Sequence, residues 1–163
     1  MEKYILVMDG WTKLTNKLND FILSGNIEMA KEISRDLSYE ELDAELTDTA
    51  FNNPSITNYA FIMSLIVENE KVELHGIAFD MLVNPLCHIE GAYYAALYHA
   101  KRCVELTNQQ DEGYLTNLLF LHDVPDTVVS EDEAYNVAKK ILSLNPNNEI
   151  AKEFMCEDRG SKL

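Results

Sequence analysis

The sequence predicts an all-α fold in which antiparallel helical hairpins stack as a short α-solenoid. The chain of 163 residues has only 6 Gly and 4 Pro, and no segment shows the strict alternation of apolar and polar residues that is typical of exposed strands. A helical pattern that begins near Ala96 also returns 38 residues later, near Ala134. With 47% hydrophobic residues, the chain can bury a core as one domain, predicted over residues 1–155, with 156–163 as a flexible tail.

Apolar residues recur at helical spacing along almost the whole chain. The predicted helices lie at about residues 9–24, 27–37, 38–48, 55–67, 72–83, 89–106, 111–122 and 130–144, and a last capping turn follows at 150–155. Gly25 and Asn26 close the first two helices into a hairpin. The segment 55–67 is the most apolar, and we expect it to be central.

Several helix ends carry recognisable local signals. Ser38 and Glu41 have the spacing of a capping box, and Ser55 can cap the next helix. Ser130 is followed by three acids in the first turn, where a negative charge meets the positive end of the helix dipole. Asn145-Pro146 ends that helix.

The segments that start at Ala95 and Ser130 repeat one pattern. The matched pairs are Ala96 with Ala134, Ala100 with Ala138, Cys103 with Ile141, and Leu106 with Leu144. Small residues one turn apart let a neighbouring helix approach closely. A helical unit that recurs at such a distance is typical of stacked repeats.

In these residues the chain resembles a tetratricopeptide (TPR) repeat, whose second helix also has small residues first and Pro just past its end. The first helix of the unit, at residues 111–122, has Tyr114, Leu118 and Leu121 in place of the family's Trp, Gly and Tyr positions, and the loop with Pro125 makes the unit longer. The resemblance implies a TPR-like right-handed helix stack over residues 90–155.

The charge is strongly acidic and unevenly distributed. The net charge is −15, and neither 36–70 nor 103–138 contains a Lys or Arg, although the two stretches hold 16 of the 28 acids. Nucleic acid is excluded as a direct ligand, because its phosphates would be repelled. A basic protein is the expected partner, although an acidic surface can also serve solubility alone.

We expect the partner to bind acids and tyrosines on exposed helix faces. The candidate residues are Glu41, Glu45, Asp48, Tyr94, Tyr98, Asp111, Glu112, Asp123 and Asp126. The first three acids recur at four- and three-residue spacing and should form one strip on a helix. Aromatic side chains ringed by complementary charge are common in tight protein interfaces.

No catalytic or metal-binding pattern is complete. His99 and Cys103 have the spacing of two metal ligands, and Cys87-His88 pairs a thiol with a base, but no further ligand or third group follows. His75, His88 and His122 stand near Glu73, Glu90 and Asp123, as expected by chance in so acidic a chain. We therefore predict no catalytic residue, no metal and no cofactor; a small metal- or thiol-dependent enzyme is the alternative.

The chain contains no predicted membrane span, and the apolar run at residues 4–8 is interrupted by Asp9 before it reaches the length of a signal-peptide core. Three cysteines are typical of reduced thiols in a cytoplasmic protein. The C-terminal Ser161-Lys162-Leu163 matches a peroxisomal address, which is the alternative location in a eukaryote.

The stretch from residue 92 to residue 148 also resembles the C-terminal part of small helical immunity proteins encoded beside bacterial polymorphic toxins. That resemblance implies an acidic cytosolic inhibitor that occludes the basic face of a toxin, for example a nuclease. The alternative is a TPR-like adaptor that binds a peptide or a regulatory protein.

Overall fold

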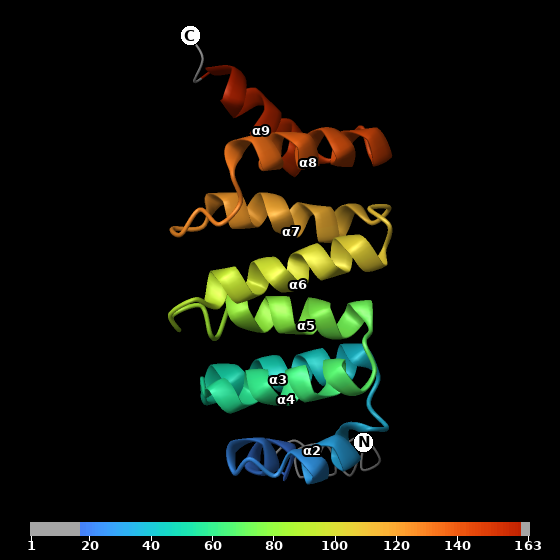
Figure 1. The fold of residues 1–163 in the computed structure, drawn as a ribbon, viewed down its shortest axis with the longest axis vertical. Coiled ribbons are helices and arrows are strands. Elements are labelled where there is room, and N and C mark those ends of the chain that lie inside the picture. Colours follow the sequence, from blue (N-terminus) through green and yellow to red (C-terminus); the bar gives the residue numbers. More distant parts are fainter. Residues whose placement is uncertain (1–16, 161–163) are drawn as a thin grey trace, which may run out of the picture. The chain divides into compact units, whose positions relative to one another are not determined.

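The computed structural model describes residues 17–160, and within this range all regular secondary structure is α-helical, as predicted (Figure 1). Contacts divide the chain into an N-terminal unit, Met1–His88, and a C-terminal unit, Ile89–Leu163. The second unit begins one residue before the part that resembles a TPR repeat. The single domain over 1–155 stays a prediction.

The N-terminal unit consists of short helices with locally determined ends. Residues 17–23 are helical, and α2 (Ile27–Ser34), α3 (Tyr39–Asn52), α4 (Ile56–Glu68) and α5 (Val72–Val83) follow. The helix predicted at 9–24 begins outside the described residues. It ends at a left-handed Gly25 (φ 72°), a conformation that glycine adopts without a Cβ clash. The capping box of α3 is present, with Ser38 N donating to Glu41 Oε2 at 2.8 Å.

Helix α4 is central in this unit, because it packs against α2, α3 and α5. Its Phe61, Ile62 and Ile66 are buried, and Leu42 and Leu46 of α3 face inward as predicted. α3 also packs on α5. In Figure 1, α4 lies in front of α3, with α2 and α5 on its two sides.

The C-terminal unit is built from successive packed helices. These are α6 (Ala92–Leu106), α7 (Glu112–Asp123), α8 (Glu131–Leu144) and α9 (Glu149–Gly160). Each packs on the next, and α7 also contacts α9 (Figure 1). In place of the predicted capping turn at 150–155, the chain forms the full helix α9, which continues past Cys156, where the tail was predicted to begin. No Gly or Pro interrupts residues 149–159, and Ala151 and Phe154 continue the apolar helical spacing.

The 38-residue repeat corresponds to a shared packing pattern. Ala96, Ala100, Ala134 and Ala138 are all fully buried, and α7 packs against both α6 and α8. Each copy thus buries its two matched alanines, and α7 lies between the two copies. The last matched pair does not share this burial: Leu106 is exposed and Leu144 is only half-buried.

Candidate protein-binding surfaces

The acids of α3 form no ion pair with a Lys or Arg in the part of the chain that the structure describes. They are Glu40, Glu41, Asp43, Glu45 and Asp48. The nearest described Lys and Arg residues in sequence, Arg35 and Lys71, lie outside the helix. α3 is therefore a strongly negative helix whose charge is not compensated by described bases.

The three acids predicted to form a strip on α3 have different environments. Glu41 accepts the N-cap hydrogen bond from Ser38 N and is half-buried. Glu45 is also half-buried, and its Oε2 is buried without a hydrogen-bond partner among the described residues. Only Asp48 is exposed. The helical spacing is as expected, but the strip offers one fully accessible carboxylate.

Asp43 of α3 and Asp80 of α5 form an acidic pair between the two helices. Partial burial, and secondarily the charge of Asp43, raises the pKa of Asp80 from 3.8 to about 6. Thr47 Oγ1 donates to Asp43 Oδ1 at 3.2 Å, so Asp43 keeps a hydrogen bond. Sequence reasoning missed Asp80, because only the packing of α3 on α5 brings the two acids together.

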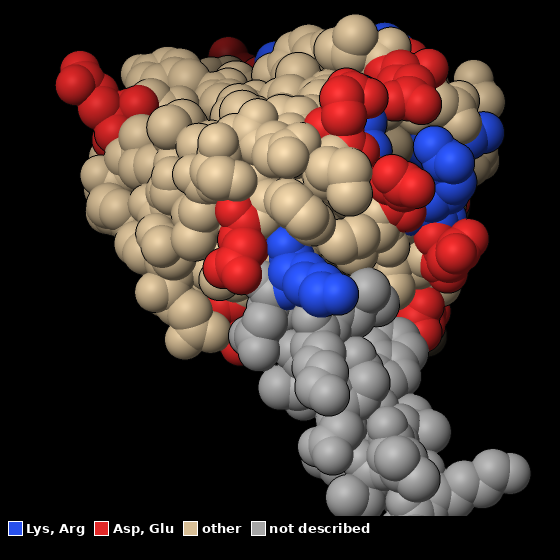
Figure 2. All heavy atoms as spheres, turned by 90° about the horizontal axis from the view of Figure 1, so that it is seen from below, with Lys and Arg blue, Asp and Glu red and all other residues tan. Residues whose placement is uncertain are grey.

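On the face that Figure 2 shows, acidic residues do not form one continuous patch. On the face shown in Figure 2, viewed from the α2 end of Figure 1, acids occur in separate groups, some beside Lys and Arg, and much of the described surface is uncharged. The excess of acid in the sequence is thus dispersed on this side. Particular helices, rather than net charge, define the candidate surfaces.

The two acids at the start of α7 stabilise the fold. Asp111 caps the helix, because its Oδ1 accepts from Gly113 N at 2.9 Å and Tyr114 N at 3.3 Å. Glu112 accepts from Asn145 Nδ2 at 3.0 Å and from Asn148 Nδ2 at 3.4 Å. Glu112 therefore holds the loop between α8 and α9 against α7.

Asp123 and Asp126 lie at the other end of α7, and both are exposed. A helix of this length spans roughly 18 Å. The four acids predicted around α7 thus form two separate pairs. Among the described residues, only Asp111 and Glu112 of these four acids accept a capping or loop hydrogen bond, so Asp123 and Asp126 remain candidates for partner binding.

Tyr94 and Tyr98 project from one side of α6, since they are one turn apart and are 62% and 51% exposed. The Tyr98 ring meets the buried His99 edge to face, with 5.1 Å between ring centroids. The third tyrosine of this helix, Tyr93, is half-buried. Tyr94 and Tyr98, the two tyrosines that the sequence predicts as aromatic anchors for a partner, are thus exposed.

A groove of about 590 Å³ runs between α6 and α8. Its floor contains Leu115 and Leu118 of α7, and charged residues of α6 and α8 form its rims. Lys101 Nζ and Glu133 Oε1 form an ion pair across it at 3.0 Å. The groove thus combines an apolar floor with rims of mixed charge.

A smaller pocket of about 270 Å³ lies among α2, α4 and the starts of α3 and α5. Its Lys31 Nζ lies 2.9 Å from Glu68 Oε2 and 3.7 Å from Glu28 Oε1. The hydrogen bond with Glu68 raises the pKa of Lys31. The volume is below the usual range of small-molecule sites, about 300–1,000 Å³, and the lysine is already paired.

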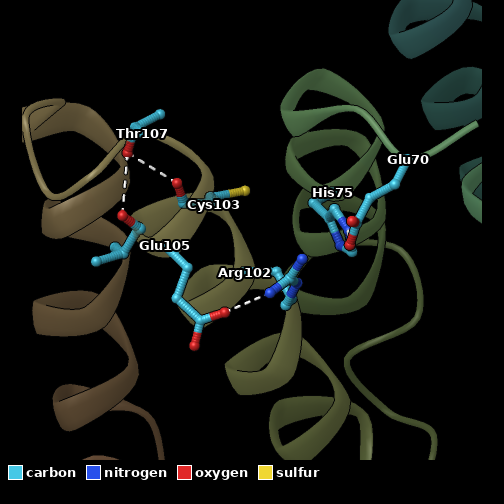
Figure 3. Close-up of polar contacts among 7 residues, drawn as sticks. Glu70, His75, Arg102, Cys103, Glu105 and Thr107 are labelled. Atoms are coloured by element: carbon cyan, nitrogen blue, oxygen red, sulfur yellow. Dashed lines mark hydrogen bonds and ion pairs between the residues drawn. The ribbon is translucent and has the colours of Figure 1, made fainter.

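The possible metal ligands are core residues. His99 and Cys103 are both fully buried in α6. No group of three His, Cys, Asp or Glu side chains that could hold a metal occurs within residues 17–160. Near them, Thr107 Oγ1 donates to the Cys103 carbonyl at 2.8 Å, and Arg102 pairs with Glu105 (Figure 3).

The histidines predicted beside acids have other partners. His75 is fully buried, and its Nε2 lies 3.1 Å from Glu70 Oε1 rather than beside Glu73 (Figure 3). His122 Nδ1 donates to the Val129 carbonyl at 3.0 Å, and its ring packs edge to face on Phe154. Both side chains thus take part in helix and loop packing.

Cys87 and His88 lie in the turn after α5, where Cys87 is half-buried and His88 is exposed. No hydrogen bond between their side chains occurs among the described contacts. The residues are neighbours in sequence, and the structure shows no pairing of thiol and base.

No protein family model matches this chain, and no curated protein or solved structure is significantly similar to it. Among the described residues, no helix is both long and apolar enough to cross a membrane.

Proposed function

We propose that this chain is an acidic, non-catalytic protein-binding module whose partner is a basic protein. The observation that carries the proposal is the uncompensated charge of α3, where five acids have no Lys or Arg partner among the described residues. Such charge raises the rate at which an oppositely charged protein associates. The surface around α3 is therefore the proposed entry point for the partner.

The test begins with capture of partners by the tagged full-length chain from its source cell, followed by mass spectrometry. The association rate of the captured protein is then measured at low and at physiological salt. We expect a basic protein whose association slows steeply as salt rises, because screening shortens the range of charge attraction.

The matched variants separate α3 from the rest of the acidic surface. The double variant Glu40→Lys with Asp48→Lys changes two exposed acids of α3 and should slow association. The double variant Glu90→Lys with Glu153→Lys changes two exposed acids outside α3 by the same charge and should have a smaller effect. An acidic partner, or equal rates for all three proteins at every salt concentration, would refute the proposal.

In its most specific form, the proposal makes the chain an immunity protein that occludes the active face of a cognate basic toxin, for example a nuclease. The acidic charge supports it, as does the resemblance of residues 92–148 to such proteins. A toxin gene immediately upstream and loss of toxin activity on mixing are the expected results. Toxin activity that persists at saturating concentrations of this chain would contradict this form.

A TPR-like adaptor is the second candidate, and the groove between α6 and α8 favours it. In this second candidate function, the helices form a right-handed TPR-like stack, and a peptide of the partner binds over Leu115 and Leu118. Leu118→Gln should then abolish peptide binding, with a melting curve as the check on folding. An unaltered affinity in a folded variant would remove the groove from consideration.

The non-catalytic part of the proposal has its own test. Protein purified without added metal should contain no stoichiometric zinc by elemental analysis. One zinc per chain that is lost on His99→Ala or Cys103→Ala would favour a metal-dependent enzyme instead.

A further inference from the structure

The groove between α6 and α8 has an apolar interior within the C-terminal unit. Leu115 and Leu118 of α7 form its floor, and Val104 of α6 and Val137 of α8 also line it. Leu115, Leu118 and Val137 are buried, and Val104 is half-buried. Its volume of about 590 Å³ lies within the usual range of ligand sites, about 300–1,000 Å³. Apolar side chains of a ligand would leave water here, which favours their binding.

Two ion pairs neutralise most of the charge at the rims of the groove. Lys101 Nζ of α6 lies 3.0 Å from Glu133 Oε1 of α8, so this pair joins the two helices. Glu105 of α6 is paired with Arg102, which lies one turn earlier in the same helix. These side chains already have partners of opposite charge, so they do not identify a ligand.

Two further charged side chains of the groove form no ion pair among the described residues. Asp132 is exposed and Lys140 is half-buried, and neither belongs to any of the described ion pairs. They are the first and the last residues of α8 that line the groove. Eight positions of helix correspond to about 12 Å along the axis. The unpaired charge is therefore negative toward the start of α8 and positive toward its end.

Two uncharged polar side chains are also available to a ligand. Gln109 and Asn136 line the groove and are exposed, and neither side-chain amide has a hydrogen-bond partner among the described residues. The end of α6 fixes the position of Gln109, whose N donates to the Val104 carbonyl at 2.8 Å. A side-chain amide offers both a donor and an acceptor, which match the N–H and C=O groups of a peptide. The two amides thus suit an extended segment, whose backbone groups are free.

We infer that this groove binds an extended peptide segment with a basic and an acidic residue about four positions apart and apolar residues between them. The inference rests on the second candidate function, the peptide-binding adaptor, and adds the charge pattern of the peptide. The basic residue pairs with Asp132 and the acidic residue with Lys140, because four residues of extended chain span about 13 Å. Successive side chains alternate in such a segment, so the apolar ones face Leu115 and Leu118 while the charged ones lie at the rim.

Other occupants fit these features less well. A small ligand with a single charge can pair with Asp132 or with Lys140, but it leaves the other unpaired. A bound helix uses its backbone groups internally, so it offers few of them to Gln109 and Asn136. A second copy of this chain is distinguished by experiment, because its binding would produce a dimer.

The probe is a synthetic peptide with the core Lys-Leu-Ser-Leu-Glu, blocked at both termini so that only its side chains are charged. Three further peptides replace the Lys, the Glu or both by Gln. Each peptide is titrated into the isotope-labelled full-length chain, and NMR gives the affinity and the resonances that shift. The parent peptide should shift resonances of the groove. Each loss of a peptide charge should weaken binding roughly threefold, as for a solvent-exposed ion pair.

Charge-neutral variants of the chain assign each peptide charge to its partner. Lys140→Gln should weaken binding of the parent peptide roughly threefold and should not change the affinity for the peptide that lacks Glu. Asp132→Asn should have the same effect on the parent peptide and none on the peptide that lacks Lys. Lys139→Gln and Glu153→Gln are the matched controls, because both side chains are exposed and lie outside the groove. Melting curves show that each variant is folded.

Four results would overturn the inference. They are no shift of groove resonances by the parent peptide, equal affinity for the parent and the doubly neutral peptide, charge effects that persist in Lys140→Gln and Asp132→Asn, and a dimer in analytical ultracentrifugation that Leu118→Gln abolishes. If folded Leu118→Gln loses the captured partner while both charge-neutral variants bind it like the wild type, the charge pattern fails and the adaptor function stands. If folded Leu118→Gln keeps the wild-type affinity for the captured partner, the adaptor function itself fails.

Discussion

The two base-free acidic stretches of the sequence have different structural roles. Around α7, Asp111 caps the helix and Glu112 binds two asparagines of the loop before α9. In α3, by contrast, Glu40 and Asp48 are exposed, and Asp43 lies close enough to Asp80 to raise its pKa. Asp111 and Glu112 stabilise the fold, as Glu41 does in the capping box of α3, whereas Glu40 and Asp48 are available to a partner.

This difference shows that an excess of acid in a sequence does not identify a binding surface. A carboxylate that accepts hydrogen bonds from a helix end or a loop is already used. The variants proposed above therefore address α3 rather than all nine candidate residues. The contrast between the regions can be tested through stability, because structural acids should be costly to remove and exposed acids should not.

The largest expected effect is that of Ala138→Glu in α8. Ala138 is fully buried at the second matched alanine of the repeat. A charge there should destabilise the C-terminal unit by about 3 kcal/mol or more, since moving a carboxylate from water into the packed interior is costly. Circular-dichroism melting measures the loss, and Asn136→Glu on the exposed side of α8 is the control. A melt unchanged from that of wild type would mean that the repeat register is wrong.

A smaller loss is expected for Glu112→Ala. The substitution leaves the amides of Asn145 and Asn148 without their carboxylate partner, which should cost about 1–2 kcal/mol in chemical denaturation. Asp126→Ala, in the exposed loop after α7, should change stability by less than about 0.5 kcal/mol. Equal effects of the two variants would remove the distinction between structural and available acids around α7.

Asp80→Asn should stabilise the N-terminal unit at neutral pH. The folded state holds the Asp80 proton more tightly than the unfolded chain, because the pKa rises from 3.8 to about 6. The contribution of Asp80 to the unfolding free energy should therefore fall as pH rises from about 4 to about 6, and it should stay constant at higher pH.

In the Asn variant this part of the pH dependence should disappear, with a gain at pH 7 below about 1 kcal/mol, since solvent screens the partly exposed group. Asp36→Asn, an exposed acid before α3, is the control. If the unfolding free energies of the wild type and of the Asp80→Asn variant rise by the same amount between pH 4 and pH 6, that result would argue against repulsion at Asp80.

The smallest stability effect should come from Glu40→Lys and Asp48→Lys. Both side chains are exposed and form no described ion pair, so each change should alter the unfolding free energy by about 0.5 kcal/mol or less. Denaturant titration at pH 7 checks this. A loss comparable to that of Glu112→Ala would show that Glu40 and Asp48 stabilise the fold, as the capping residue Glu41 does.

Helix identity and most helix ends were predictable from the sequence, because the interactions that decide them are local. Ser38 with Glu41, Ser55 and Ser130 each cap a helix within three residues of the cap. The buried alanine pairs of the repeat were predictable for a related reason, since their spacing follows from the geometry of one helix. The final helix was underestimated, because its start at Asn148 carries a cap but no apolar run as regular as that of α8.

The sequence by itself determined an acidic, all-helical chain with a repeated C-terminal unit. Only the tertiary structure decided which acids are available and which apolar face is open. Glu112 meets Asn145 from 33 residues away, and Asp43 influences Asp80 across the packing of α3 on α5. The apolar residues of α4 look alike in sequence, yet Ile62 is buried while Val67 is exposed. Burial depends on which elements pack together in three dimensions, and helical periodicity alone does not specify that.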